Sequence, residues 1–363
     1  MLPWQRNLGL FIVKIVFDKK RRLIKMKKIL SLVLVVLLVA TVFAGCGKKD
    51  TASVPEKTEK EETFEGTNIR IGGLKGPTSM GLVKLLDDAE NGKTVNTYDF
   101  TMAAAADELT PKLIKGELDI LAVPANLGSV LYNKTNGAVK MLAVNMLGAV
   151  YIAEKGGNTI NSLADLKGKT IYATGKGTTP EYVLAYLLKQ NGLDITKDVT
   201  MEWKSEPTET VATIKTMDNA VAMLPQPFIT VATTQVPDLK IALDLNAEWD
   251  KLDNGSKFVT AGLVVRSEFA KENPDAIKAF MKEYANSTKF VKENVSEGAA
   301  LIEKYDIVKA QIAEKALPQC NIVCMKGKEM KEAVTGYLNV LFEQNPQSVG
   351  GKLPADDFFL MYE

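Results

Sequence analysis

Residues 162–184, SLADLKGKTIYATGKGTTPEYVL, show the local order of elements that decides the fold. Residues 162–169 predict a short helix and turn, and 170–173 predict a strand because β-branched and aromatic residues favour pleated structure. A turn rich in glycine and threonine follows. Pro180 then stands near the start of an apolar run, which is typical of a helix N-terminus, and a helix is expected over 180–190. The stretch therefore predicts a strand, a hydroxyl-rich turn and a helix in succession.

The same alternation extends in both directions from this stretch. Strands are expected at 68–74, 97–104, 118–124, 139–152, 199–204, 220–224, 240–245 and 258–265, and helices at 78–90, 108–115, 126–132, 208–217, 228–235, 275–294, 297–305 and 328–344. Alternation at this spacing predicts an α/β protein with parallel sheets and helices on both faces. Roughly 300 residues exceed one comfortable core, so two lobes are expected.

An export signal precedes this region. Residues 26–46, MKKILSLVLVVLLVATVFAGC, combine two lysines, an uncharged apolar run and small residues directly before Cys46. The run is short for a membrane span, although a buried helix or a plain transmembrane anchor is an alternative. The order resembles the lipobox of bacterial lipoproteins, which implies a signal peptide at 26–45 and lipidation (palmitate) of Cys46. Residues 1–25 are then a non-translated stretch or an extended basic n-region, with translation starting at Met26 or at Met1.

Charge and composition narrow the function further. Residues 46–66 are charged and nearly free of large apolar groups, so they are expected to form a flexible tether. The first 45 residues are rich in lysine and arginine, and the chain beyond them is acidic. An acidic surface argues against nucleic acid as a partner, because nucleic-acid binding needs a basic stripe. Beyond residue 45 the arginines are Arg70 and Arg266, so bidentate arginine clamps are scarce.

Catalytic and metal-binding residue types are also scarce. The chain has no histidine, which removes the commonest general base and metal ligand. Cys320 and Cys324 are interpreted either as small apolar residues in a packed segment or as a surface disulfide. Two cysteines without histidine make a poor zinc site. No metal, no cofactor and no catalytic residue is expected, and the protein is not expected to be an enzyme.

Five phrases resemble a known family: IRIGGLKGPTSMG at 69–81, DILAVP at 119–124, the stretch 162–184, AVAMLPQPF at 220–228 and ENPDAIKAFMKEY at 272–284. Together with the cysteine and the tether, they look like the solute-binding lipoproteins of ABC importers. The likeness is to the branch related to nitrate-, sulfonate- and taurine-binding proteins, with a periplasmic-binding-protein-like fold of type II. It covers about 67–363.

The resemblance implies an architecture. Each lobe would be a mainly parallel sheet with helices on both faces, and two crossing strands, near 150–154 and 261–265, would act as the hinge. The first lobe would comprise 67–152 and 262–363, and the second 153–261. The protein would be a monomer that is lipid-anchored to the outer face of the cell membrane. It would capture a small organic, acidic solute in the cleft and deliver it to the permease subunits of an ABC transporter.

The cleft residues follow from strand order, because open α/β sheets bind ligands beyond the carboxyl ends of their strands. The loop at 75–81 follows the first strand and offers Thr78, Ser79 and Met80, and Thr78 or Ser79 is expected to cap the next helix. The loop at 175–181 offers Thr178 and Thr179 in the same construction. Two helix N-termini facing each other could hold an acidic group without arginine. Ordinary capping without a ligand is the alternative.

Two further strand ends complete the expected site. Asn126 follows the strand at 118–124 and offers both a donor and an acceptor, unless it only caps the next helix. Gln226 stands between two prolines, where relatives often carry glutamate, so pairing of a ligand amine with a carboxylate there is in doubt. Asn145 and Tyr151 could reach the cleft. Trp203 and Trp249 are interpreted as packing residues.

The sequence also allows two other functions. A scaffold or sensor lipoprotein would share the anchor and the fold without a transport role. An enzyme related to the pyrimidine-precursor synthases would use the same scaffold, but it would need reactive groups that the cleft loops do not offer.

Overall fold

The computed structural model describes residues 64–362. The expected signal peptide at 26–45, the lipidation site Cys46, the stretch 1–25 and the tether up to residue 63 lie outside the described residues. Within the described part, none of the helices combines the length and apolar character that crossing a bilayer requires.

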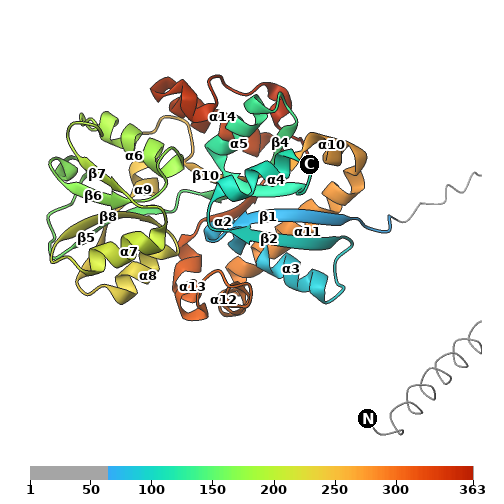
Figure 1. Ribbon diagram of the computed structural model, residues 1–363, viewed down its shortest axis with the longest axis horizontal. Coiled ribbons are helices and arrows are strands. Elements are labelled where there is room, and N and C mark those ends of the chain that lie inside the picture. Colours follow the sequence, from blue (N-terminus) through green and yellow to red (C-terminus); the bar gives the residue numbers. More distant parts are fainter. Residues whose placement is uncertain (1–63, 363) are drawn as a thin grey trace, which may run out of the picture. The chain divides into compact units, whose positions relative to one another are not determined.

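The first sheet has six strands (Figure 1). In chain order they are β1 (Asn68–Leu74), β2 (Thr97–Ala103), β3 (Ile120–Pro124), β4 (Val139–Leu147), β10 (Val259–Arg266) and β11 (Ile322–Met325), arranged spatially as β11-β4-β10-β3-β1-β2. Strand β1 is parallel to β2 and β3. Strand β10 is antiparallel to both β3 and β4, and β11 is antiparallel to β4.

The second sheet has five strands, arranged as β7-β6-β8-β5-β9. They are β5 (Val150–Lys155), β6 (Thr170–Ala173), β7 (Thr200–Trp203), β8 (Ala220–Pro225) and β9 (Leu239–Asp244). Strand β6 is parallel to β7 and β8, whereas β5 is antiparallel to β8 and β9. The predicted two-lobed α/β fold with mainly parallel sheets is confirmed. In the first sheet β1, β2, β3 and β4 share one direction, and β10 and β11 run against it. In the second sheet β6, β7, β8 and β9 share one direction, and β5 runs against it.

Helices cover the sheets as the alternation predicts. They are α2 (Pro77–Met80), α3 (Val83–Glu90), α4 (Thr110–Ile114), α5 (Ala125–Lys134), α6 (Thr179–Gln190), α7 (Pro207–Lys215), α8 (Phe228–Gln235), α9 (Leu245–Asp250), α10 (Ser267–Glu272), α11 (Pro274–Glu293), α12 (Val295–Lys304), α13 (Ala310–Ala316) and α14 (Gly327–Gln344). The helix predicted over 78–90 is two helices, α2 and α3. The break falls at Gly81, where a Cβ atom would lie 2.9 Å from the Tyr284 hydroxyl of α11, so the backbone approaches too closely for any side chain.

The two passages between the sheets differ from the predicted crossings. The strand predicted over 139–152 is divided into β4 and β5 at residues 148–149, and the return passage runs through 251–258 before β10 begins. The residues predicted as crossings are instead paired within a sheet. Those at 150–154 belong to β5 of the second sheet, and those at 261–265 belong to β10 of the first. At Gly148 a Cβ atom would lie 2.3 Å from Asn246 Oδ1 and 2.5 Å from Phe258 Cδ1. Glycine is therefore required where the first passage crosses the second.

Both faces of the first sheet are buried. Ile69 and Ile71 of β1 pack with Leu85 of α3 and with Phe280 and Tyr284 of α11 on one face. On the other face, residues of α4, α5 and α14 pack into a separate cluster. Buried faces on both sides explain why the central strands β3 and β10 carry nearly continuous apolar runs.

Cys320 and Cys324 flank the start of β11, and both are free cysteines. Cys320 is buried, and burial raises the pKa of its thiol to about 12. The packed-segment interpretation of this pair agrees with the structure, and the surface disulfide does not.

Candidate functional site

The predicted polar residues lie at the carboxyl ends of strands from both sheets, and of them Asn126 and Thr179 are in direct contact. Thr78 and Ser79 follow β1, Asn126 follows β3, Thr179 follows β6, and Gln226 follows β8. Asn126, Thr179 and Gln226 are each 3% exposed or less. Buried polar groups need hydrogen-bond partners, so the partners of these side chains show how the two sheets meet.

The first contact between the lobes joins α6 to α5. The Thr179 hydroxyl donates to Asn126 Oδ1 at 3.3 Å. The backbone carbonyl of Thr260, at 3.4 Å, is a second acceptor for the same hydroxyl. Asn126 Nδ2 in turn donates to the carbonyl of Ser348 at 3.0 Å. Asn126 thus reaches across to the second lobe and is not a helix cap.

The second contact centres on Gln226. Its Nε2 donates to Gln319 Oε1 at 2.9 Å, and its Oε1 accepts from the Thr230 hydroxyl at 2.8 Å. The Tyr151 hydroxyl donates to the backbone carbonyl of Gln319 at 3.2 Å. Burial raises the pKa of Tyr151 well above its ordinary value, so this hydroxyl stays a donor. Sequence reasoning missed Gln319, because nothing in its neighbourhood distinguishes it from any polar residue between helices.

The expected caps are not formed. The Ser79 hydroxyl donates to the carbonyl of Leu74 at 2.7 Å, and the Thr78 hydroxyl donates to the same carbonyl at 3.4 Å. Neither side chain therefore caps α2. In the second lobe, the Thr178 hydroxyl donates to the carbonyl of Gly175 at 2.7 Å. The carbonyl of Gly175 also accepts from the backbone N–H of Thr178 at 3.0 Å, so this contact closes the turn before α6. Helix α2 is four residues long, so its dipole is weak, whereas α6 has twelve.

Met80 and Thr178 lie apart from the polar contacts. Met80 is fully buried in the apolar cluster that α12 and α13 form, and its sulfur lies 3.8 Å from Cys320 Sγ. Thr178 is half-exposed at the start of α6.

Asn145 near the end of β4 belongs with the site residues. It is 2% exposed, and its Nδ2 donates to the backbone carbonyl of Thr78 at 2.9 Å. Its Oδ1 is buried and has no hydrogen-bond partner among the described residues. The signal in the sequence is an asparagine inside the buried apolar run 141–146 of this strand.

Both arginines of the described part lie at the opposite end of the first sheet. Both pair with Asp119: its Oδ1 lies 2.6 Å from Arg70 Nη2 and 3.1 Å from Arg266 Nη2. Asp119 directly precedes β3, whereas the site residue Asn126 follows the end of β3. Burial alone would raise the pKa of Asp119, but the hydrogen bonds from Arg70 and Arg266 outweigh it, and the net pKa is lowered. Neither arginine therefore lies where it could hold an acidic group at the site.

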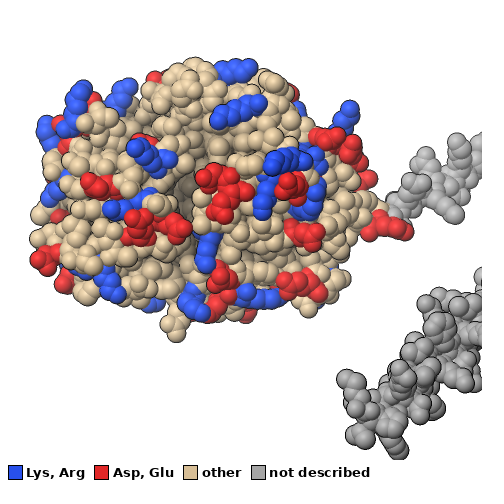
Figure 2. Space-filling model, viewed as in Figure 1, with Lys and Arg blue, Asp and Glu red and all other residues tan. Residues whose placement is uncertain are grey.

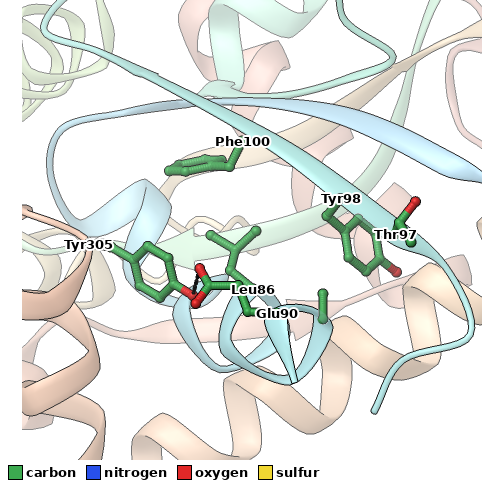
Figure 3. A pocket seen from close by; sticks show the side chains of 7 residues that line it. Leu86, Glu90, Thr97, Tyr98, Phe100 and Tyr305 are labelled. Atoms are coloured by element: carbon green, nitrogen blue, oxygen red, sulfur yellow. Dashed lines mark hydrogen bonds between the residues drawn. The ribbon is translucent and has the colours of Figure 1, made fainter. Parts of the chain in front are cut away.

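The surface of the described residues has a hollow between the two sheets and a separate cavity in the first lobe. The space-filling view is hollowed between the parts formed by the two sheets, and charged side chains of both signs border the hollow (Figure 2). A separate cavity of about 310 Å³ lies between α3 and β2 in the first lobe and is partly closed by Tyr305, whose hydroxyl donates to Glu90 at 2.8 Å (Figure 3). Leu86, Tyr98 and Phe100 also line it, and none of the predicted site residues does. Residues 64–362 contain no group of three or more histidine, cysteine, aspartate or glutamate side chains that could hold a metal ion.

Comparisons with known proteins concern the fold that carries this site. Residues 139–297 match the family described as NMT1/THI5 like. An ABC transporter from Parabacteroides distasonis is 26% identical, with a TM-score of 0.67 over 81% of this chain and 99% of that chain. The periplasmic aliphatic sulphonate binding protein SsuA from Escherichia coli is 17% identical, with a TM-score of 0.65 over 82% of this chain and 94% of that chain.

A Brucella abortus protein, named only as a binding protein, is 25% identical over 177 residues, which make up 48% of this chain and 52% of that protein. The chain thus spans about half the length of the curated relatives it matches. The predicted resemblance to solute-binding proteins of ABC importers is confirmed, and the sulphonate-binding and nitrate-binding neighbours share the type II periplasmic-binding-protein-like fold.

Proposed function

We propose that this chain captures a small organic, acidic solute between its lobes and delivers it to a membrane permease. The premise is its resemblance to the substrate-binding components of ABC transporters. The observation that carries this proposal is the pair of polar contacts between the lobes, Thr179 with Asn126 and Gln226 with Gln319. Each contact joins a strand end of the second sheet to a residue of the first lobe. A solute held there would touch both lobes, which is how a ligand biases a hinged protein toward closure.

The proposed binding residues are the polar ones at the strand ends: Thr78, Ser79, Asn126, Thr178, Thr179 and Gln226. Met80, expected with them from the sequence, packs instead in the apolar cluster of α12 and α13. An acidic group on the solute is supported by two features. The N-terminus of α6 lies beside Thr179 and favours negative charge, and the hydroxyls of both lobes supply donors. Sulfonate binding by the Escherichia coli neighbour is consistent with such a solute.

We propose that the two passages divide the lobes, because the boundaries expected from the sequence, 67–152 and 262–363 for the first lobe and 153–261 for the second, cut β5 and β10, which lie wholly in the second and the first sheet. The passages at 148–149 and 251–258 would absorb the rotation between an open and a closed form of a monomer. Few residues need to change conformation in such a motion, because both passages are short.

The solute contacts are tested by two double variants. Replacing Thr178 and Thr179 by valine, or Thr78 and Ser79 by alanine, is expected to lower affinity about tenfold, because lost hydrogen bonds to a charged group cost about 1.5–3 kcal/mol. The measurement is calorimetric titration with the solute that mass spectrometry identifies in the purified protein. Thr213→Val on the exposed face of α7 is the matched control and should bind normally. Native affinity in both double variants would move the site away from these loops.

Anchoring is proposed through Cys46, as a lipid on the outer face of the cell membrane. Cys46→Ser is expected to release the protein from the membrane fraction while leaving solute affinity unchanged, because residues 46–66 are proposed to separate the anchor from the lobes. Fractionation followed by immunoblotting measures this. A variant that is processed and still sediments with the membrane would contradict the lipid anchor.

A further inference from the structure

The carboxamide of Asn145 has a fixed orientation. Its Nδ2 donates to the backbone carbonyl of Thr78 at 2.9 Å. If the amide were rotated by half a turn, Oδ1 would face that carbonyl oxygen, and two acceptors would stand in contact without a proton between them. The positions of the nitrogen and oxygen in this amide therefore follow from the hydrogen bond.

Asn145 Oδ1 is an unsatisfied acceptor in a nearly closed environment. The residue is 2% exposed, and the oxygen is buried without a partner among the described residues. Leaving a buried acceptor unpaired costs about 1–3 kcal/mol, so native structures rarely do so without a reason. The two other buried amides of the site differ, because Asn126 Oδ1 accepts from Thr179 and Gln226 Oε1 accepts from Thr230.

Asn145 contacts a segment of the first lobe that faces the second lobe. Its amide contacts Thr78, which belongs to α2 at the carboxyl end of β1. At Gly76, where α2 begins, a Cβ atom would lie 3.9 Å from the ring of Phe228, the first residue of α8 in the second lobe. The region around α2 is thus covered by the opposite lobe.

We propose that Asn145 Oδ1 accepts a hydrogen bond from the bound solute. The solute then carries an N–H or O–H donor, such as an amine, amide or hydroxyl, on the part that lies against α2. A bare sulfonate or carboxylate at that position would place its lone pairs against the Asn145 oxygen. The acidic group and the donor are therefore at different ends of the solute. This inference rests on the proposed function and adds a second recognition element to it.

Two matched series of probes test the inference on the full-length chain. Ethanesulfonate, 2-hydroxyethanesulfonate and 2-aminoethanesulfonate share one acidic group and differ at the other end, as do butyrate, 4-hydroxybutyrate and 4-aminobutyrate. In at least one series the hydroxyl or amino member is expected to bind about tenfold more tightly than the methyl member in calorimetric titration. Asn145→Leu, which keeps the shape and removes the acceptor, is expected to bring that ratio close to one.

Asn133→Leu is the matched control. Asn133 lies on α5, donates to two backbone carbonyls and also has an unpaired Oδ1, but it contacts Val349 and Lys352 and is half-exposed. This variant should keep the discrimination of the native chain. If Asn145→Leu does not fold, the comparison within each series on the native chain still decides whether the bound solute needs a donor, and equal binding there overturns the inference.

The outcomes separate this inference from the proposed function. Equal or tighter binding of the methyl members, or discrimination that persists in Asn145→Leu, overturns the inference and leaves a solute-binding protein. A co-purified solute without any N–H or O–H donor has the same consequence. A chain that binds none of the six probes and carries no co-purified solute overturns the proposed function and the inference together.

Discussion

The Asp119→Asn variant is expected to lose about 3 kcal/mol of unfolding free energy. Asp119 is 1% exposed and accepts hydrogen bonds from the Arg70 backbone at 3.0 Å, from Arg70 Nε at 2.8 Å and from Arg266 Nη2 at 3.1 Å. Removing one partner of a buried ion pair costs about 3–5 kcal/mol, because the remaining charge is left without compensation. The lower end applies here, since both arginines are partly exposed and retain some hydration. Urea unfolding measures the change.

The loss should depend on pH in a defined direction. The folded pKa of Asp119 lies below its ordinary value, because the hydrogen bonds from the arginines outweigh the effect of burial. Its contribution to stability is therefore fully present above the unfolded pKa of about 3.9 and is lost as pH falls toward the folded pKa. The gap between the native chain and Asp119→Asn should narrow below about pH 4. Asp107→Asn, an exposed aspartate of the same lobe, is the control, and an equal loss there would contradict this account.

The Trp249→Ala variant is expected to lose about 3–5 kcal/mol, the usual range for removing a buried aromatic side chain. Trp249 on α9 is 1% exposed, and its ring stacks on Phe258 with centroids 5.7 Å apart. Tyr337 of α14 lies at 5.7 Å and Tyr186 of α6 at 5.0 Å. The indole Nε1 donates to the Ser256 hydroxyl at 3.2 Å. This one side chain therefore holds the return passage at 251–258 against elements of both lobes.

Trp203→Ala provides the matched comparison. Trp203 lies on β7, the edge strand of the second sheet, and is only partly buried. The same substitution there should cost clearly less, because less apolar area leaves contact with the core. Chemical denaturation measures both variants, and near-ultraviolet circular dichroism should show a larger loss of fixed aromatic packing in Trp249→Ala. Equal costs for the two tryptophans would contradict the structural role assigned to Trp249.

The sequence predicted the elements that depend on local patterns. The strand at 68–74 and the helix at 228–235 have the predicted limits in β1 and α8. Apolar spacing, proline and glycine signal such elements because each of them acts within one or two turns of the chain. The same patterns predicted which strand ends carry polar side chains, and Asn126, Thr179 and Gln226 indeed meet partners in the opposite lobe.

The sequence by itself determined the order of elements, the α/β class and the position of hydroxyl and amide groups at the strand ends, because these follow from local periodicity and turn chemistry. The tertiary structure alone decided the break at Gly81, the passage at Gly148 and the antiparallel direction of β10. It also decided that Gln226 meets Gln319, 93 residues away, and that Asn145 Oδ1 is left without a partner. The physical reason is that close approach and hydrogen-bond satisfaction depend on atoms brought together by packing, which no local pattern records.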